Sequence, residues 1–241
     1  MVIGHGGMGI KDKRPMNSLA SLQEAIQLRS NGTEMDLQLS ADNELWLYHP
    51  GTLEESTKGK GRIRDLRSED LDKLSYTSLF GKKADVIRLS EFLSSGADFR
   101  DKILVFDCKL EAKEEPDFMN RFADRLLDMI RKYKLKDQCF IESYNIDFLR
   151  TLQAEEPGLK LFIHADRLQD CIVASNYVQL YGITMDRLNM SAADVKKAHE
   201  LNLRVALFNL DTKSENLEGI RLSPDFLQTD KMEYLLEVLK K

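Results

Sequence analysis

The sequence of 241 residues contains few cysteines, few prolines and no long apolar run. Cys108, Cys139 and Cys171 are isolated and odd in number, so they indicate neither a disulfide framework nor a paired-cysteine zinc site. Cys108 and Cys139 lie within apolar runs, and we expect both to be buried thiols. No stretch approaches the roughly eighteen apolar residues of a membrane-spanning helix, so no membrane span is expected. The compartment stays open between the cytoplasm and export after removal of a leader.

An excess of charge of one sign is also missing. The formal net charge is −5, and acidic and basic residues are interspersed along the chain. Nucleic-acid-binding proteins usually carry a basic patch, so we expect no nucleic-acid partner. With 42% hydrophobic and 31% charged residues, the composition is that of a globular protein. The length is close to the typical size of one α/β barrel, about 250 residues.

What is present is a short apolar run followed by an amphipathic helix, repeated to the end of the chain. Strands are predicted over residues 2–5, 33–39, 103–109, 139–142, 161–164, 178–185, 203–208 and 226–229. Helices are predicted over residues 18–29, 91–95, 116–133, 146–154, 167–174, 192–201, 214–218 and 232–239, with caps at Ser18 and Ser90.

This alternation predicts a TIM (β/α)8 barrel that forms a single domain over residues 1–241. The rival fold is a doubly wound open sheet, which normally has a glycine-rich turn that opens its first helix. The glycines at 4–7 do not fit that pattern, because they precede the first predicted helix by about ten residues. We therefore favour the barrel.

An insertion at residues 40–88 separates the second strand from its helix. Residues 45–49 alternate in polarity and follow a turn at 42–43, and such a short connection can only return as an antiparallel hairpin. A two-residue turn places Asp36 opposite His49, and side chains of an opposed pair share one face. The hairpin is therefore predicted to bring His49 to the acidic face of the second strand.

Carboxylates gather on one face of two predicted strands. Glu34 and Asp36 alternate with apolar residues, so both side chains point the same way. Asp107 and Lys109 repeat this arrangement on the next barrel strand. Three carboxylates brought together form an oxygen-lined site suited to Mg²⁺ or Ca²⁺. The alternatives are a solvated strand face for the acidic pair and a structural salt bridge between Asp107 and Lys109.

Two histidines are predicted to reach the same site. His5 ends the first strand at the rim where TIM barrels carry their active sites, and the hairpin supplies His49. Histidine titrates near neutral pH, so a histidine pair beside a cation suits cleavage of an anionic ester. His164 ends a later strand near the barrel mouth, where no motif supports a role. His199 is predicted to lie on a helix surface.

In order and spacing, these motifs resemble those of the glycerophosphodiester phosphodiesterases, TIM-barrel enzymes that share a mechanism with phosphatidylinositol-specific phospholipases C. The resemblance covers nearly the whole chain. The family's His-Arg-Gly, Glu-Asn-Thr/Ser, Glu-x-Asp, His-Asp and Glu-x-Lys motifs correspond to His5-Gly6-Gly7, Met16-Asn17-Ser18, Glu34-Met35-Asp36, His49-Pro50 and Asp107-Cys108-Lys109. Further similar segments are 87–93, 141–145 and 225–230.

The resemblance implies metal-dependent hydrolysis of a small-molecule glycerophosphodiester to glycerol phosphate and an alcohol, through attack of a substrate hydroxyl and a cyclic phosphate. It implies an acid–base pair of histidines, three carboxylate ligands for Mg²⁺ or Ca²⁺, and a lysine that contacts phosphate: His5 and His49; Glu34, Asp36 and Asp107; and Lys109. Asn17 and Tyr144 are further candidates for substrate binding. The headgroup, the choice of cation and the oligomeric state are not specified.

The chain departs from the family pattern at Gly6, Met16, Pro50 and Asp107. Gly6 stands where the family has an arginine on the phosphate, and charged hydrogen bonds of that kind are worth about 1.5–3 kcal/mol. Met16 and Pro50 replace acidic residues, and Arg14 is a nearby candidate for the missing positive charge. Asp107 is one methylene shorter than the usual glutamate, which would shift the cation. We expect hydrolysis with a changed substrate.

Two other functions remain as alternatives. Gly6 and Pro50 favour an inactive or altered barrel that binds a phosphorylated ligand without turnover. A phospholipase that acts at a lipid surface needs an apolar rim, and the insertion offers Leu53, Tyr76, Leu79 and Phe80. These four residues are also suited to packing the insertion onto the barrel.

Overall fold

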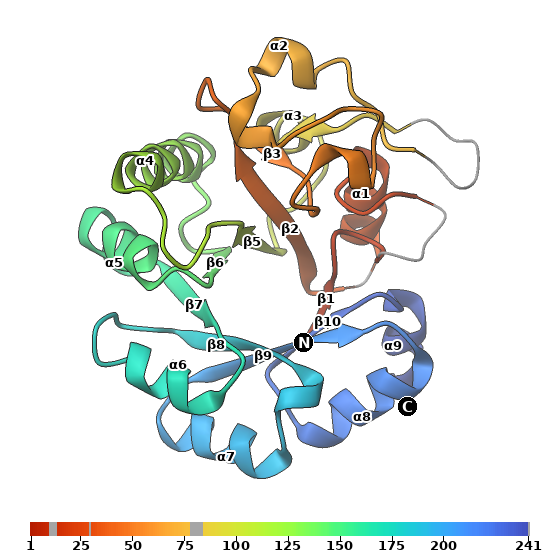
Figure 1. Ribbon diagram of the computed structural model, residues 1–241. Coiled ribbons are helices and arrows are strands. Elements are labelled where there is room, and N and C mark those ends of the chain that lie inside the picture. The colour runs from red at the N-terminus through yellow and green to blue at the C-terminus, as the bar shows by residue number, and fades with distance from the viewer. Residues whose placement is uncertain (10–13, 29, 78–83, 241) are drawn as a thin grey trace.

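The computed structural model describes residues 1–9, 14–28, 30–77 and 84–240. Its parallel strands close into a barrel, because β1 pairs with β10 on one side and with β2 on the other. In ring order the barrel strands are β1 (Val2–Gly4), β2 (Gly32–Leu39), β5 (Ile103–Cys108), β6 (Cys139–Ser143), β7 (Lys160–His164), β8 (Gly182–Asp186), β9 (Arg204–Leu210) and β10 (Phe226–Thr229). The predicted TIM barrel is confirmed (Figure 1).

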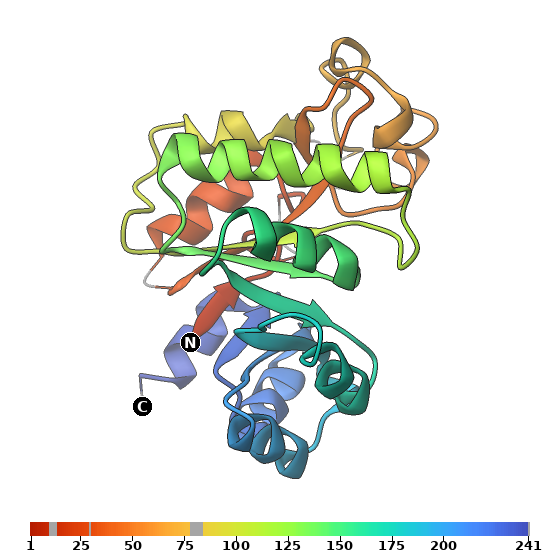
Figure 2. The same cartoon turned by 90° about the vertical axis from the view of Figure 1, so that its left-hand side faces the viewer.

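A helix follows each barrel strand and lies outside the ring of strands (Figure 2). These helices are α1 (Leu19–Gln27), α3 (Leu89–Leu93), α4 (Pro116–Tyr133), α5 (Ile146–Glu155), α6 (Leu168–Ala174), α7 (Ala192–Glu200), α8 (Lys213–Leu222) and α9 (Met232–Val238). Among the described helices, none combines the length and the apolar character needed to cross a membrane.

The helix ends follow local chemistry. The side chain of Ser18 accepts a hydrogen bond from the amide of Ser21, which confirms the predicted cap of α1. The predicted cap at Ser90 is wrong. α3 begins two residues earlier than predicted, at Leu89, because Glu91 accepts a hydrogen bond from the amide of Arg88, and Ser90 lies inside the helix. The predicted end of the first helix, at residue 29, lies outside the described residues.

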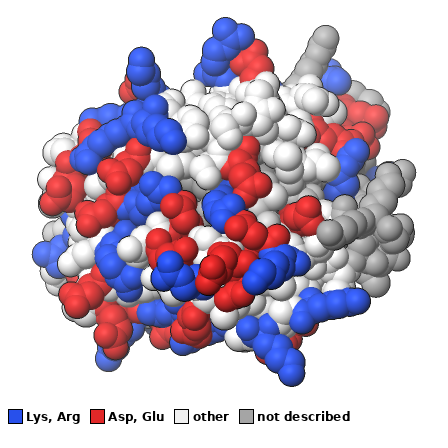
Figure 3. Space-filling view, turned by 90° about the horizontal axis from the view of Figure 1, so that it is seen from above, with Lys and Arg blue, Asp and Glu red and all other residues white. Residues whose placement is uncertain are grey.

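Residues 40–88 leave the barrel after β2. They carry β3 (Leu45–Leu47), the 3-10 turns η1 (Leu53–Glu55) and η2 (Ile63–Asp65), α2 (Ser68–Leu71) and β4 (Ile87–Arg88). β3 pairs antiparallel with the end of β2 and with β4, which confirms the predicted hairpin. On the face seen from above, basic and acidic side chains are intermingled (Figure 3).

The register of this hairpin differs from the prediction by one residue. The amide of Tyr48, not that of His49, donates to the carbonyl of Asp36. The loop is longer than two residues, since the amide of Ser40 already bonds to the carbonyl of Glu44. Asn43 within the loop has φ of 64°. Asparagine tolerates this left-handed conformation, so a three-residue connection forms without glycine.

Alternation along the strands sorts the barrel interior into two layers. The lower layer is apolar and consists of Ile3, Val105, Phe140, Phe162, Ala206 and Phe226. The residue two positions later on each strand points to the same side, nearer the C-terminal ends. Those residues are His5, Asp107, Glu142, His164, Phe208 and Gln228. A layer of buried apolar side chains therefore lies beneath a mostly polar upper layer, at the rim where TIM barrels carry their active sites.

Candidate active site

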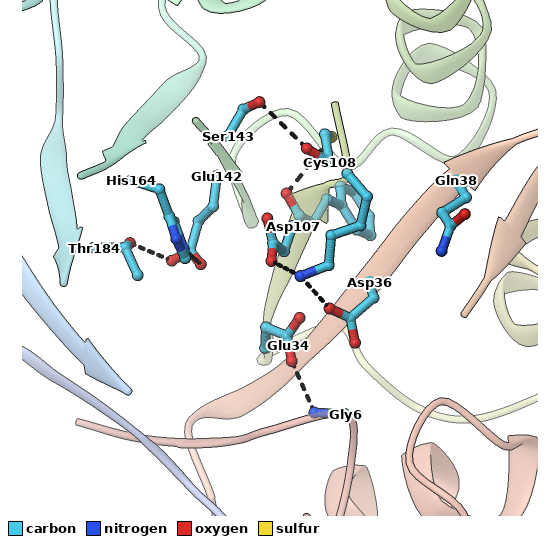
Figure 4. A network of polar contacts seen from close by, with 12 residues as sticks. Gly6, Glu34, Asp36, Gln38, Asp107, Cys108, Glu142, Ser143, His164 and Thr184 are labelled. Carbon is cyan, nitrogen blue, oxygen red and sulfur yellow. Dashed lines mark hydrogen bonds and ion pairs between the residues drawn. The ribbon is translucent and has the colours of Figure 1, made fainter. Parts of the chain in front are cut away.

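Three carboxylates from neighbouring strands meet in the upper layer. Glu34 and Asp36 come from β2, and Asp107 on β5 lies directly beside Asp36. Each side chain offers one oxygen, and these oxygens lie within 4.8 Å of one another. All three side chains are buried, and Figure 4 shows them converging on one point. The structure thus brings together the three predicted metal ligands.

Lys109 neutralises part of this negative charge. Its ammonium forms an ion pair with Oδ1 of Asp36 at 2.7 Å and donates a hydrogen bond to Oδ2 of Asp107. Burial alone lowers the pKa of Lys109, but the nearby carboxylates outweigh burial and raise it well above its ordinary value. Burial raises the pKa of Asp36, yet Lys109 and the two histidines bring it down to about 2. Lys109 therefore forms the salt bridge with Asp107 that we stated as the alternative. Its contact with phosphate stays a prediction.

Asn17 holds Asp36 from the other side. Its Nδ2 donates to Oδ2 of Asp36 at 2.6 Å, and its Oδ1 accepts from the amide of Asp36 at 3.1 Å. Asn17 is fully buried and has φ of 62°, a conformation that asparagine tolerates better than most residues. This geometry makes Asn17 a positioning residue for Asp36. Its predicted contact with substrate stays a prediction.

Glu34 keeps one oxygen without a partner. Its Oε2 accepts a hydrogen bond of 2.8 Å from the amide of Gly6. Its Oε1 is buried and has no hydrogen-bond partner among the described residues. Burial and the charge of Asp36 raise the pKa of Glu34 well above its ordinary value. A buried unpaired oxygen is costly, and a hard divalent cation would satisfy it, so the residues present fit Mg²⁺ or Ca²⁺.

His5 is oriented by Asp230, a residue that the sequence reasoning missed. Nδ1 of His5 lies 2.8 Å from Oδ1 of Asp230, which is buried directly after β10. Burial lowers the pKa of His5, but the hydrogen bond to Asp230 and the charge of Glu34 outweigh burial and raise it to about 9. The bond at Nδ1 leaves Nε2 for a substrate. Its place at the end of a barrel strand was the available signal for Asp230.

His49 reaches the site from just beyond β3. The ring centroids of His5 and His49 lie 6.4 Å apart, with their planes at 86°. Nε2 of Gln38 donates to the carbonyls of Tyr48 and Pro50, at 2.7 and 2.8 Å. These two bonds fix the backbone on both sides of His49, which is why it faces the site despite the shifted register. Gln38 is a second positioning residue that the sequence reasoning missed.

The departures at positions 6 and 16 are structurally linked. Gly6 has φ of 55°, and a Cβ added there would lie 2.6 Å from Cβ of Met16. Met16 therefore fills the space that a side chain at position 6 would need. Arg14, the candidate replacement for the missing charge, forms an ion pair with Glu24 instead. The structure gives it no role at the acidic cluster.

A cavity of about 290 Å³ opens beside the catalytic candidates. Asp107, Lys109 and His49 line it. The other lining residues come from the end of β2, the insertion, the segment after β5, the first turn of α4 and the turn after β6; they include Gln38, Arg62, Arg64, Glu111, Glu114, Phe118 and Tyr144. Tyr144 is 48% exposed, so the structure places this substrate-binding candidate at the mouth of the cavity.

The insertion does not offer Leu53 and Tyr76 as an apolar rim. Both side chains are buried in a hydrophobic cluster of the insertion, together with Trp46 and Tyr48. They therefore pack the insertion, as the structural alternative stated. The other two candidates, at positions 79 and 80, lie outside the described residues.

A closed (β/α)8 barrel with buried carboxylates and two facing histidines at its rim defines a barrel enzyme built for a charged substrate. The chain belongs to the glycerophosphoryl diester phosphodiesterase family, whose model matches residues 8–234. The protein is thus an enzyme of the phosphodiesterase class, and the family resemblance drawn from its motifs is confirmed.

Relatives of known name agree with this membership. The chain is 24% identical over 246 aligned positions to a glycerophosphodiester phosphodiesterase of Caldanaerobacter subterraneus subsp. tengcongensis, covering 100% of this chain and 98% of the relative. Its fold resembles a phosphodiesterase of Oleispira antarctica solved with the product sn-glycerol-3-phosphate, with a TM-score of 0.88, 18% identity and coverage of 100% and 97%. A glycerophosphodiester phosphodiesterase of Parabacteroides distasonis gives a TM-score of 0.83, 22% identity and coverage of 99% and 96%.

Proposed function

We propose that this enzyme cleaves glycerophosphodiesters to glycerol phosphate and an alcohol, with a divalent cation and two catalytic histidines. The observation that carries this proposal is the buried trio Glu34, Asp36 and Asp107, with oxygens within 4.8 Å of one another beside His5 and His49. With all three carboxylates ionised, the trio and Lys109 together carry a formal charge of −2, which one Mg²⁺ or Ca²⁺ would balance.

The trio would hold the cation, which would offset the negative charge of the phosphodiester and polarise its oxygens. With that cation bound, the negative charge around Lys109 is compensated from a second source. Lys109 can then turn its ammonium toward the phosphate, which is the role that the Glu-x-Lys motif suggests. Because Met16 fills the space that a side chain at position 6 would need, Lys109, which lines the cavity and lies beside the trio, is the positive side chain that we assign to this contact.

The two histidines divide the proton transfers. His49 accepts the proton of a substrate hydroxyl as its oxygen forms a bond to phosphorus. The bond from phosphorus to the leaving oxygen breaks, and His5 donates a proton to that oxygen. His5 suits the donor role because its hydrogen bond to Asp230 raises its pKa and favours the protonated form. Water then opens the cyclic phosphate with the two roles reversed.

We also propose that residues 1–241 act as one catalytic domain, in which the insertion 40–88 supplies His49 and part of the cavity wall. Support comes from the hairpin that joins the insertion to β2 and from the bonds of Gln38 to both sides of His49. The insertion is therefore expected to be required for activity, not only for stability.

The test is turnover of a panel of glycerophosphodiesters with Mg²⁺, Ca²⁺ or EDTA, followed by release of glycerol phosphate. Cation-dependent release that EDTA abolishes is the expected result, and the panel identifies the preferred headgroup. Tight binding of glycerol phosphate by folded, cation-loaded protein without turnover of any diester would instead support the binding-only alternative.

A further inference from the structure

The upper layer of the barrel has a second half that the proposed mechanism does not use. It consists of Glu142 on β6, His164 on β7, Thr184 on β8 and Gln228 on β10, all buried. Figure 4 shows Glu142, His164 and Thr184 on the opposite side of Asp107 from Asp36. The catalytic half and this second half therefore face each other across the barrel mouth.

Glu142 continues the row of carboxylates but has no oxygen to spare. It lies beside Asp107 in the sheet, as Asp107 lies beside Asp36. The hydroxyl of Thr184 donates to it at 2.8 Å, and Nε2 of Gln228 donates to its two oxygens at 2.8 and 3.0 Å. Both carboxylate oxygens of Glu142 thus accept hydrogen bonds, whereas Glu34 has one oxygen without a partner among the described residues. These bonds fix Glu142 relative to its neighbours.

One of those neighbours is His164, whose Nε2 lies 3.4 Å from Oε2 of Glu142. Because the carboxylate accepts, the proton of a neutral imidazole sits on Nε2 and leaves Nδ1 as an acceptor. Nδ1 is buried and has no hydrogen-bond partner among the described residues, in a side chain that is only 8% exposed. A buried acceptor without a partner needs an explanation, and a donor from outside the protein is one that would satisfy it.

His164 lies next to the catalytic cavity. Its ring contacts the edge of Tyr144, with centroids 4.6 Å apart, and stacks on Phe208 at 5.4 Å. Tyr144 also lines the cavity that contains Asp107 and Lys109, and it is half exposed. Tyr144 thus contacts both the cavity and the ring of His164, and because exposed side chains change rotamer on a nanosecond scale, it is the side chain that would turn to admit a ligand to His164.

We propose that Nδ1 of His164 accepts a hydrogen bond from a substrate hydroxyl that takes no part in the reaction, with Glu142 fixing the imidazole. This inference rests on the proposed function, because it concerns the same substrate. A glycerol ester has one hydroxyl that attacks phosphorus and a terminal hydroxyl that does not react. His164 would bind the terminal one, so the enzyme would select three-carbon polyol esters over diol esters.

The test compares two chromogenic diesters with the same leaving group, glycerol p-nitrophenyl phosphate and propane-1,2-diol p-nitrophenyl phosphate, in the presence of Mg²⁺. Both keep the attacking hydroxyl, and only the first has the terminal hydroxyl. A single neutral hydrogen bond gives an expected preference in kcat/KM of about three- to tenfold for the glycerol ester. Release of p-nitrophenol measures both.

Three variants separate recognition of the substrate hydroxyl by His164 from a purely structural role of the residues around Glu142. His164→Gln keeps an amide that can donate to Glu142 but has no acceptor at the Nδ1 position, so the preference should fall to about onefold. His164→Asn restores an acceptor there and should recover part of the preference. The matched control Thr184→Val removes another donor to Glu142 and should lower the thermal midpoint while leaving the preference intact.

An equal loss of kcat/KM for both esters in His164→Gln would overturn the recognition role while leaving the phosphodiesterase proposal standing. If the wild-type protein cleaves neither ester, the phosphodiesterase proposal fails. The role of His164 in recognition is then tested separately, by measuring ligand binding. Calorimetry with glycerol phosphate and propane-1,2-diol phosphate then replaces turnover. A preference for glycerol phosphate that His164→Gln removes supports the subsite, and equal binding or no binding of the two overturns it.

Discussion

The pair His5–Asp230 makes the stability of the metal-free protein depend on pH. His5 binds its proton more tightly in the folded chain, where its pKa is about 9, than in the unfolded chain, where it is near 6.5. This contribution to stability is fully present below about pH 6.5 and is lost as the pH rises through about 9. At about 1.4 kcal/mol for each pKa unit, the loss is about 3 kcal/mol.

The variant Asp230→Asn tests this linkage. It keeps the shape of the side chain but removes one of the negative charges that hold the proton on His5, with Glu34 and Asp36 left in place, so the loss between about pH 6.5 and 9 should become clearly smaller. The assay is urea unfolding in EDTA at several pH values, followed by fluorescence of Trp46, the single tryptophan, which is fully buried. Other groups that titrate in this window, including the amino group of Met1, are common to both proteins and cancel in the comparison.

Asp225→Asn is the matched control. Asp225 also contacts a histidine, His199, at 2.9 Å, but that histidine is 40% exposed. Exposed pairs of this kind contribute little to stability, so this variant should keep the part of the pH slope that comes from His5, and only the smaller share from the Met1 amino group beside Asp225 should change. Equal slopes in the wild type and Asp230→Asn would refute the assignment of the linkage to His5.

Three further outcomes are expected. Glu34→Gln should abolish calorimetric binding of Mg²⁺ or Ca²⁺ while the protein stays folded, and unchanged affinity would remove the trio as the metal site. Asn17→Ala should weaken cation binding about 10–100-fold, because it releases Asp36 from the two bonds that orient it; calorimetry measures this too. Gly32→Ala should cost about 3 kcal/mol or more, since the new Cβ would lie 1.9 Å from the carbonyl oxygen of Ile103; an unchanged thermal midpoint would contradict it.

Local periodicity was sufficient to predict the barrel and the acidic trio. The alternation of polar and apolar residues on the two strands predicts a common direction for Glu34, Asp36 and Asp107, and the parallel pairing of β2 with β5 places Asp36 beside Asp107. The hairpin register was not predictable in this way. It depends on a left-handed Asn43, and nothing in the hydrophobic pattern separates a two-residue from a three-residue loop.

The positioning residues were harder to predict, because their contacts are distant in the sequence or depend on a particular backbone bend. Asp230 meets His5 across 225 positions of the chain. In the sequence, Gln38 is indistinguishable from any polar residue on a strand. Its bonds to the carbonyls of Tyr48 and Pro50 depend on the position at which the backbone leaves the hairpin. The pairing of Lys109 with two carboxylates was foreseen as an alternative, but the sequence alone could not rank it above a phosphate contact.

The most direct measurement is cleavage of one accepted glycerophosphodiester by the wild type, His5→Ala, His49→Ala and Asp107→Asn at a Mg²⁺ concentration that saturates the wild type. General acid–base catalysis is typically worth about 10²–10⁴-fold, so each histidine variant should lose at least about 100-fold in kcat while remaining folded. Asp107→Asn should lose activity and recover part of it at higher Mg²⁺. Wild-type rates in either histidine variant, or full activity in EDTA, would contradict the proposed metal and histidine mechanism.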